Sequence, residues 1–369
     1  MPLRAKIEGF SDVSIGLLGS VYFGGMLAGT LAAPAIVRWS GHIRAFTAFV
    51  AVAVVVVLLY PIAVKPAAWI GLRGVIGFAF AGLYAVIESW VNAKAENENR
   101  GRVYAVYQVV HFAGSASGQQ FLGLEGAQSF ALFSATAALF ALALLPLSIT
   151  QADPPGEPGS ARVRIGWMSR MAPVAAAAAF LVGAANGSYW SLAPVYALQV
   201  GLAPGQVGVM MTATILGSAL AVYPVGRLSD RFDRRLVLVW CATAGAVVEA
   251  ILVVARAPDF TMLLALMFAI GATTMVLYSL AASHANDRVG PEHGVEIASA
   301  LLFLYCAGAI LFPTVSAWLV GRFGPPALFA QNACLHAALV VFTVWRMSIR
   351  TRAPRVPTDE RAVVKKPTP

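Results

Sequence analysis

Charge is what this sequence has least of. Asp, Glu, Lys and Arg make up 12% of its 369 residues, whereas 59% are hydrophobic and the mean hydropathy is +0.74. A soluble domain carries roughly 25% charged residues. A soluble globule with half that share would leave apolar surface in water and aggregate. The composition therefore excludes a soluble protein and favours one that spans a membrane.

Cysteine is also scarce, and the sequence motifs of enzymes are missing. The three cysteines, Cys241, Cys306 and Cys334, are isolated within apolar runs, which fits neither a disulfide framework nor a metal site. There is no His-Glu-x-x-His motif and no nucleotide-binding loop, and Ala116 stands where a Gly-x-Ser-x-Gly motif would have its serine. We therefore expect no catalytic residues, no metal, no cofactor and no fused ATPase.

Eleven apolar runs, each close to the 20 residues or so that cross a bilayer, follow one another along the chain. Backbone polar groups find no water in lipid, so each run is predicted to be a helix. The fold class is then an all-α membrane protein, a helical bundle with eleven spans. The predicted spans cover residues 15–37, 45–64, 68–91, 103–124, 130–149, 171–200, 207–225, 236–255, 260–282, 297–320 and 326–345.

The basic residues alternate from loop to loop. Most of the 26 Lys and Arg lie in every second loop and in the C-terminal tail. Cytoplasmic loops carry such an excess, which places the C-terminus in the cytoplasm, the residues before Ile15 outside, and the protein in the cytoplasmic (inner) membrane. This pattern also explains the net charge of +9 without a nucleic-acid partner.

A long polar segment divides the chain into two parts. Residues 151–170 are rich in Pro, Gly and Arg and are predicted to form a cytoplasmic linker. Five spans precede it, within residues 1–150, and six follow, within residues 171–346. The basic, proline-rich tail at 347–369 is expected to be disordered along the inner leaflet.

The two parts show signs of an internal repeat. A shift of 192 residues superposes Gly9 on Gly201, Gly16 on Gly208 and Gly25 on Gly217, and it brings the turn at 38–44 onto residues 230–236. A duplicated bundle whose halves meet across a central cavity is the architecture of many secondary transporters.

The charged turn at residues 226–235 carries a motif. Its sequence, Gly-Arg-Leu-Ser-Asp-Arg-Phe-Asp-Arg-Arg, resembles the signature loop of the major facilitator superfamily (MFS), Gly-x-Leu-Ala-Asp-Arg-x-Gly-Arg-Arg, with Asp233 in place of the second glycine. The equivalent turn of the first half is degenerate, because it keeps Gly41 but has Arg38 where the family has an acid. The proline-containing antiporter motif of the fifth helix is absent.

Other residues resemble the YcaD-like permease branch of this superfamily, and the similarity covers nearly the whole chain. They are Arg73, Gly77, Ala79 and Ala81, which match an Arg-x-x-x-Gly-x-Gly-x-Ala motif except for Ala79; Val86 to Ser89; Asn99 to Arg102; Tyr107; Gly114; Gly118; Gln119; Gly187; Ser188; Pro194; and Tyr196.

This resemblance implies an MFS-type bundle of two pseudo-symmetric halves, working as a monomer, that moves a small solute by alternating access. The energy would come from a gradient, with protons as one candidate. The alternative is a membrane sensor without transport activity, or a defective transporter remnant. The sequence leaves open the solute, the direction of transport and the coupling ion.

Polar groups inside the predicted spans are candidates for the solute pathway, because such groups are costly in lipid and usually face the bundle interior. Glu88 would contact the solute or take up a coupled proton, or it pairs with Arg100 or Arg102. Arg73 faces the cavity, as the resemblance implies, or snorkels to the outer surface, and snorkelling is expected for Glu249. The other candidates would line the pathway or pack against neighbouring helices: His111, Gln119, Asn186, Tyr189 and Trp190.

The two signature turns are predicted to lock the cytoplasmic side when it closes. Asp230 would meet the positive dipole end of the helix that begins near Arg102. In the other half, Arg38 would pair with Glu292 or Glu296 at the start of the tenth span. The turn residues assigned to this gate are Arg38, Gly41, Arg44, Gly226, Asp230, Arg231, Arg234 and Arg235, and their helix-start partners are Arg100, Arg102, Glu292 and Glu296.

The repeat also predicts that the first helix of the first half is missing, since the superfamily has twelve spans. Pro194 lies near the outer end of the span at 171–200, whereas its counterpart Pro2 has a single residue before it. We therefore expect the chain to open at the outer end of an absent helix. A start site assigned too far downstream would explain this, and a further apolar stretch upstream of Met1 would support it.

Overall fold

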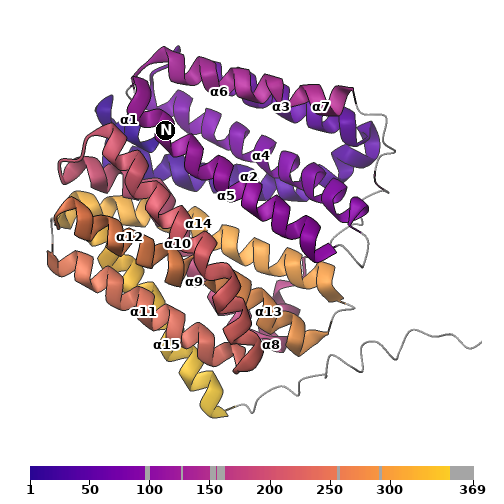
Figure 1. The fold of residues 1–369 in the computed structure, drawn as a ribbon, viewed down its shortest axis with the longest axis vertical. Helices are drawn as coiled ribbons and strands as arrows, with labels where there is room; N and C mark the ends of the chain where they lie inside the picture. The colour runs from indigo at the N-terminus through magenta and orange to yellow at the C-terminus, as the bar shows by residue number, and fades with distance from the viewer. Residues whose placement is uncertain are drawn as a thin grey trace, which may run out of the picture.

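The computed structural model describes residues 1–95, 100–125, 128–149, 155, 163–255, 258–290 and 293–349, whose regular structure is helical (Figure 1). The earlier helices form one group, at the top of Figure 1, and the later helices form a second group below it. The first half comprises α1 (Pro2–Ile7), α2 (Asp12–Ser40), α3 (His42–Leu59), α4 (Pro66–Lys94), α5 (Arg100–Glu125), α6 (Phe130–Leu142) and α7 (Leu144–Ser148). The second half comprises α8 (Ile165–Met171), α9 (Pro173–Gln199), α10 (Pro204–Arg231), α11 (Arg234–Ala255), α12 (Phe260–Thr274), α13 (Leu277–Val289), α14 (Gly294–Phe323) and α15 (Ala327–Ile349).

Each of the eleven predicted spans coincides with one long helix or with two helices separated by a short break. In the described chain, nine such units are long and apolar enough to cross a membrane, and α9, which meets α8 at an angle of 119°, is a tenth. The eleventh is α5, whose 26 residues make it about 39 Å long, although it is more polar. The all-α, multi-pass fold class is confirmed, while the breaks within α6–α7 and α12–α13 are features that the apolar pattern does not show.

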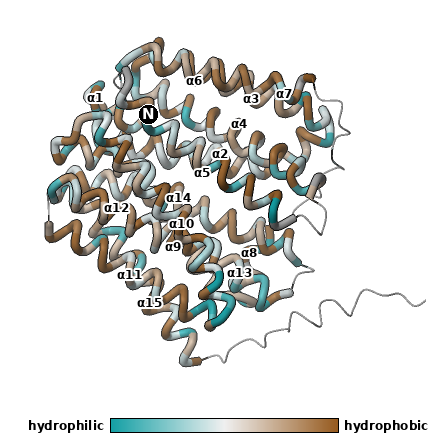
Figure 2. Tube along the Cα trace, viewed as in Figure 1, coloured by the Kyte–Doolittle hydropathy of each residue, from teal (hydrophilic) through white to brown (hydrophobic). Residues whose placement is uncertain are grey.

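Hydropathy changes along the helix axes (Figure 2). Large apolar side chains such as Val55, Val254 and Val341 are more than half exposed, where a bilayer would cover them. Hydrophilic residues gather at helix ends, most clearly around α13. We call the end that carries the turns after α2 and α10 the basic end, and the other the opposite end. The distribution of basic residues predicts that the basic end is cytoplasmic.

Glycine allows pairs of helices within each half to touch through their backbones. A Cβ atom on Gly25 of α2 would lie 2.0 Å from the carbonyl oxygen of Gly74 in α4. Likewise, a Cβ atom on Gly217 of α10 would lie 2.0 Å from the carbonyl oxygen of Phe268 in α12. No side chain fits at either crossing, and small residues of this kind hold helices together in lipid, where the hydrophobic effect does not.

The superposed glycines occupy equivalent positions in the two halves. Gly25 and Gly217 make the crossings just described. Gly16 and Gly208 both lie where one half touches the other, and Gly9 and Gly201 both have positive φ, 76° and 92°, in the turns that precede α2 and α10. Positive φ strains any residue with a Cβ. The repeat read from the sequence therefore corresponds to a repeat in the structure.

The crossing of α2 and α4 provides a test with an adjacent control. Gly25→Ala should destabilise the protein by about 1–3 kcal/mol, as expected for overpacking, and lower the midpoint of thermal unfolding in detergent. Gly24→Ala should not, because a Cβ atom on Gly24 would have no atom within 4 Å. Equal midpoints for the two variants would show that this backbone contact does not limit stability.

Candidate solute pathway

The contact between α2 and α14 is one of the two main contacts between the halves, and it is tightest at the opposite end; α1 and α2 also touch α9 of the second half. A Cβ atom on Gly16 would lie 2.6 Å from the carbonyl oxygen of Pro313 in α14. One turn further on, Ser20 Oγ lies 2.8 Å from Thr314 Oγ1. Toward the basic end the helices leave a pocket of about 110 Å³ between them, with Arg38 on one wall and residues 299, 302 and 303 of α14 on the other.

The second contact, between α5 and α10, is also at the opposite end. A Cβ atom on Gly208 would lie 2.3 Å from the carbonyl oxygen of Gln119, and Gln120 Nε2 donates to Thr212 Oγ1 at 2.6 Å. Toward the basic end α5 stays beside α4, where the Tyr104 hydroxyl donates to Asn92 Oδ1, but it is open on other faces: a Cβ atom on Gly114 would have no atom within 4 Å, and Val109 is more than half exposed. The halves are therefore joined at the opposite end and apart at the basic end.

Aromatic side chains from both halves face this separation. Phe23 of α2 lies with its ring centroid 6.4 Å from that of Tyr305 in α14, and Tyr305 lies 5.2 Å from Tyr278 of α13. On the other side, the His111 ring of α5 lies 6.2 Å from Tyr84 of α4. A pathway lined in this way offers flat apolar faces with hydroxyl groups at their edges.

Glu88 lies among these aromatic side chains. It is exposed, and it interacts electrostatically with Tyr84 of its own helix, Tyr107 of α5 and Tyr278 of α13. Because Tyr278 belongs to the other half, the exposed carboxylate lies close to where the two halves face each other. No ion pair joins Glu88 to Arg102 among the described side chains, and the Arg100 side chain lies outside them. The geometry therefore favours the pathway over the end-pair alternative.

Arg73 is held inside the first half, near the closed end of the separation. Its guanidinium carbon lies 4.2 Å from the centroid of the Tyr22 ring, and Nε donates to the Leu18 carbonyl oxygen at 3.2 Å. Tyr22 interacts with Tyr84 and with Tyr305 of the other half, so the arginine lies behind one wall of the pathway. The contacts with α2 favour this inward position over snorkelling to the surface, and a role for Arg73 in the cavity stays a prediction.

The other candidates divide into two sets. His111 is exposed between Tyr84 and Tyr107, as a lining residue would be. Asn186 of α9 is 6% exposed and interacts with Tyr305, so it lies behind the aromatic side chains in this state. Gln119 is half-buried on α5, and its carbonyl oxygen lies at the α5–α10 contact.

The remaining two candidates, Tyr189 and Trp190, pack against each other. Tyr189 is 1% exposed, and its hydroxyl is hydrogen-bonded to Thr214 of α10 within the second half. The half-buried Trp190 packs edge-on against it, with centroids 5.5 Å apart. Tyr189 is therefore not part of the lining in this state, and the packing alternative holds for it.

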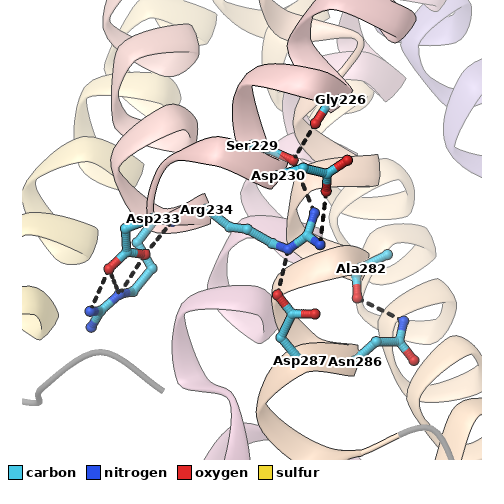
Figure 3. A network of polar contacts seen from close by, with 9 residues as sticks. Gly226, Ser229, Asp230, Asp233, Arg234, Ala282, Asn286 and Asp287 are labelled. Carbon is cyan, nitrogen blue, oxygen red and sulfur yellow. Dashed lines mark hydrogen bonds and ion pairs between the residues drawn. The ribbon is translucent and has the colours of Figure 1, made fainter. Parts of the chain in front are cut away.

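Arg234 organises the signature turn (Figure 3). Its Nε lies 2.5 Å from Asp287 Oδ2 on α13, and its terminal nitrogens reach Ser229 Oγ at 2.9 Å and Asp230 Oδ1 at 3.2 Å. Ser229 in turn donates to the Gly226 carbonyl oxygen at 3.0 Å. A planar guanidinium suits this arrangement of several acceptors. The turn thus ties the ends of α10, α11 and α13 together within one half.

Asp233, the departure from the family motif, has a structural role. It is the residue before α11, and its Oδ1 accepts a hydrogen bond from the backbone N–H of Arg235 at 3.0 Å, as an N-cap does. Its Oδ2 also lies 2.8 Å from a terminal nitrogen of Arg235. Partial burial acts to raise the pKa of Asp233, but the hydrogen bonds and charge of Arg235 outweigh it and hold that pKa below its usual value.

The other gate residues lie at the basic end. Arg38, Gly41, Arg44, Arg102 and Arg231 are exposed, Glu296 is half-buried in the first turn of α14, and Glu292 lies outside the described residues. Asp230 and Arg234 line a pocket of about 240 Å³ with residues of α12–α13. Arg38 shares a pocket with Ser299, one turn from Glu296. The lock between halves stays a prediction, because the basic ends are apart in this state.

Glu249 contradicts the prediction of snorkelling. It is 1% exposed, and its Oε2 lies 2.8 Å from Nδ1 of His336 on α15, which is also 1% exposed. The hydropathy of α11 does not indicate that Glu249 has a buried partner on α15, four helices later in the chain. A signal for His336 did exist: Asn332 and His336 lie four residues apart, so that α15 has a polar stripe along one face.

The multi-pass bundle and the pathway between its halves define a membrane transporter. The chain belongs to the Major Facilitator Superfamily, whose sequence model matches residues 175–369. It is 28% identical over 338 residues to an MFS-type transporter of Yersinia pestis (strain Pestoides F), covering 90% of this chain and 86% of that one. It is 27% identical over 340 residues, with the same coverage, to the MFS-type transporter YcaD of Shigella flexneri.

Solved structures share the fold. A point mutant of the nucleoside transporter NupG superposes with a TM-score of 0.77 at 13% identity, covering 93% of both chains. A point mutant of the fucose:proton symporter FucP of E. coli superposes with a TM-score of 0.54 at 16% identity, covering 90% of both. At these identities the likeness concerns the fold alone.

The cap on α11 yields a prediction. Asp233→Ala should cost about 0.5–2 kcal/mol of stability, the usual value of a lost N-cap, and lower the thermal midpoint at neutral pH. Asp233→Asn keeps a capping oxygen and should lose less. Because the folded pKa is depressed, the advantage of Asp over Asn is present above the unfolded value of about 3.9 and disappears as the pH falls through the folded pKa. A pH-independent difference would contradict the ion pair.

Proposed function

We propose that this protein is a secondary transporter that moves a small solute across the cytoplasmic membrane by alternating access, as a monomer with a cytoplasmic C-terminus. The observation that supports this most directly is the pathway itself. It is lined from both halves, closed where α2 meets α14 and α5 meets α10, and open toward the basic end. Rocking of the two halves about such a site exposes it to each side in turn.

The lining suggests the chemistry of the solute. Tyr84, Tyr107, Tyr278 and Tyr305 offer ring faces that stack on a flat group, and Glu88 provides a negative charge beside three of them. Aromatic faces also attract cations. We infer a small polar solute with a planar or cationic group. The nucleoside named for one structural neighbour falls in this class, so thermal-shift screening should begin with nucleosides and organic cations, since a ligand of the folded state raises its stability.

Glu88 is also our candidate for proton coupling, because no cationic partner holds it among the described side chains. Glu88→Gln should reduce uptake driven by a pH gradient at least tenfold, whereas solute counterflow, which needs no net proton movement, should continue. Asp259→Asn is a matched control: it removes a carboxylate but keeps the cap of α12, where Asp259 Oδ1 accepts from Met262 N at 3.0 Å.

Two other outcomes have distinct meanings. Equal loss of pH-driven uptake and counterflow, with normal folding, would assign Glu88 to solute binding. Unchanged rates of both processes would remove Glu88 from the mechanism.

The gate at the basic end can be tested separately. Arg38→Glu should repel Glu296 when this end closes and shift the equilibrium toward the open form. A cysteine at Leu302, on the pocket wall shared with Arg38, should then react faster with a water-soluble maleimide in a variant without the three native cysteines. Adding Glu296→Arg should restore the slower rate. If neither substitution changed the labelling rate, the proposed pair of Arg38 and Glu296 would be refuted.

The runner-up is a membrane sensor that binds the same solutes without moving them. Flux into proteoliposomes separates the two functions: a sensor would show the thermal shift with a given solute but no uptake of that solute.

A further inference from the structure

The most deeply buried carboxyl–imidazole contact of the described chain lies outside the pathway. Glu249 of α11 and His336 of α15 meet inside the second half at 2.8 Å, between Oε2 and Nδ1. Tyr189 of α9 also interacts with Glu249. A buried ion pair is weak evidence for stability, because desolvation can exceed the Coulomb gain. Its retention inside a membrane bundle points to a functional role.

The polar atoms around this pair are incompletely satisfied. His336 Nε2, Asn332 Oδ1 and Gln331 Oε1 are buried and have no hydrogen-bond partner, although Asn332 donates to the Ala185 carbonyl oxygen and Gln331 to Ser188 Oγ. Unmatched buried groups of this kind call for an explanation. Asn332 and His336 lie one helical turn apart on the same face of α15, so a small side-chain movement would bring Asn332 Oδ1 toward the ring of His336.

A groove at the opposite end reaches the edge of this region. It has a volume of about 810 Å³ and lies between the ends of α9, α11, α14 and α15. Gln331 forms part of its wall, so this side chain belongs both to the groove and to the buried cluster. Among the polar side chains of the buried cluster, Gln331 is therefore the one that a proton carried by water from the opposite end would meet first.

We propose that Glu249 and His336 form a proton-binding site, loaded at His336 Nε2 from the opposite end of the bundle. With Nδ1–H donating to the Glu249 carboxylate and Nε2 bare, the pair carries a buried charge of −1. When Nε2 takes a proton from hydronium, a water molecule leaves and the pair becomes a neutral imidazolium–carboxylate. The new N–H then gains an acceptor such as Asn332 Oδ1.

Few other titratable groups face the pair. Around it, α9 contributes Tyr189, α12 has no titratable residue, and α15 adds the exposed Cys334 on the groove wall. The titratable side chains of α13 and α14, such as His284 and Tyr305, do not interact with Glu249 among the described groups. Glu88 lies in the proposed pathway and Glu249 lies inside the second half, so the two carboxylates would exchange protons with different sides of the membrane.

Nitrogen-15 NMR of histidine-labelled protein in lipid nanodiscs tests the site without a solute. The chain has 5 histidines, and His336→Gln identifies the signal of His336. We expect this signal to change from the Nδ1–H tautomer to imidazolium as the pH is lowered. Glu249→Gln should weaken proton binding at least a hundredfold, because an imidazolium would then be buried without a counter-charge. Asn332→Leu, which leaves Glu249 and His336 in place, should weaken proton binding roughly tenfold.

His284→Gln, which removes another buried histidine, is the control and should leave the titration of His336 unchanged. A His336 signal that stays the same from acidic to alkaline pH in the folded wild type would overturn the proposal and leave the pair a structural link. A titration that survives both Glu249→Gln and Asn332→Leu would also overturn it. Because the readout needs no transport, it is independent of whether the protein moves a solute.

Discussion

Close backbone contact between helices is the constraint on which this structure depends. In lipid, apolar side chains gain little by turning toward one another, so helix association relies on packing and on hydrogen bonds across small residues. The crossings at Gly25 and Gly217 leave no room for a Cβ atom. They fix the arrangement of each half as a unit, and the contacts at Gly16 and Gly208 join the two units at one end only.

The functional geometry follows from that asymmetry. With the halves joined at the opposite end, the helices diverge toward the basic end and expose Glu88, His111 and the tyrosines to a shared space. The signature turn belongs to one half in this state, since Arg234 ties α10, α11 and α13 together. The turn can therefore hold the helices of the second half together while the first half moves toward them at the basic end. The same half contains the Glu249–His336 pair, buried where α11 meets α15.

Much of this could be predicted from the sequence, for physical reasons. A bilayer requires long apolar runs, so eleven spans were visible, and a duplicated chain repeats its glycines, so Gly16 and Gly208 could be paired before their contacts were known. The breaks in α6–α7 and α12–α13 were not visible, because apolarity continues through them. The tyrosines of the pathway and the partner of Glu249 depend on which faces of distant helices meet, and hydropathy does not encode that. In the sequence, Asp233 is only a departure from the family motif; its role as the cap of α11 depends on hydrogen bonds that the sequence does not show.

Rocking of two preformed halves is the central claim of this account, and double electron–electron resonance distances in lipid nanodiscs test it most directly. One spin-label pair would join Trp39 to Phe232 at the basic end, and another would join Ile62 to Phe323 at the opposite end; all four side chains are exposed. In a variant without native cysteines, each pair should show two populations whose proportions change with pH in opposite senses, one end lengthening as the other shortens. A single, unchanging distance at both ends, or distances that lengthen and shorten together, would contradict the account.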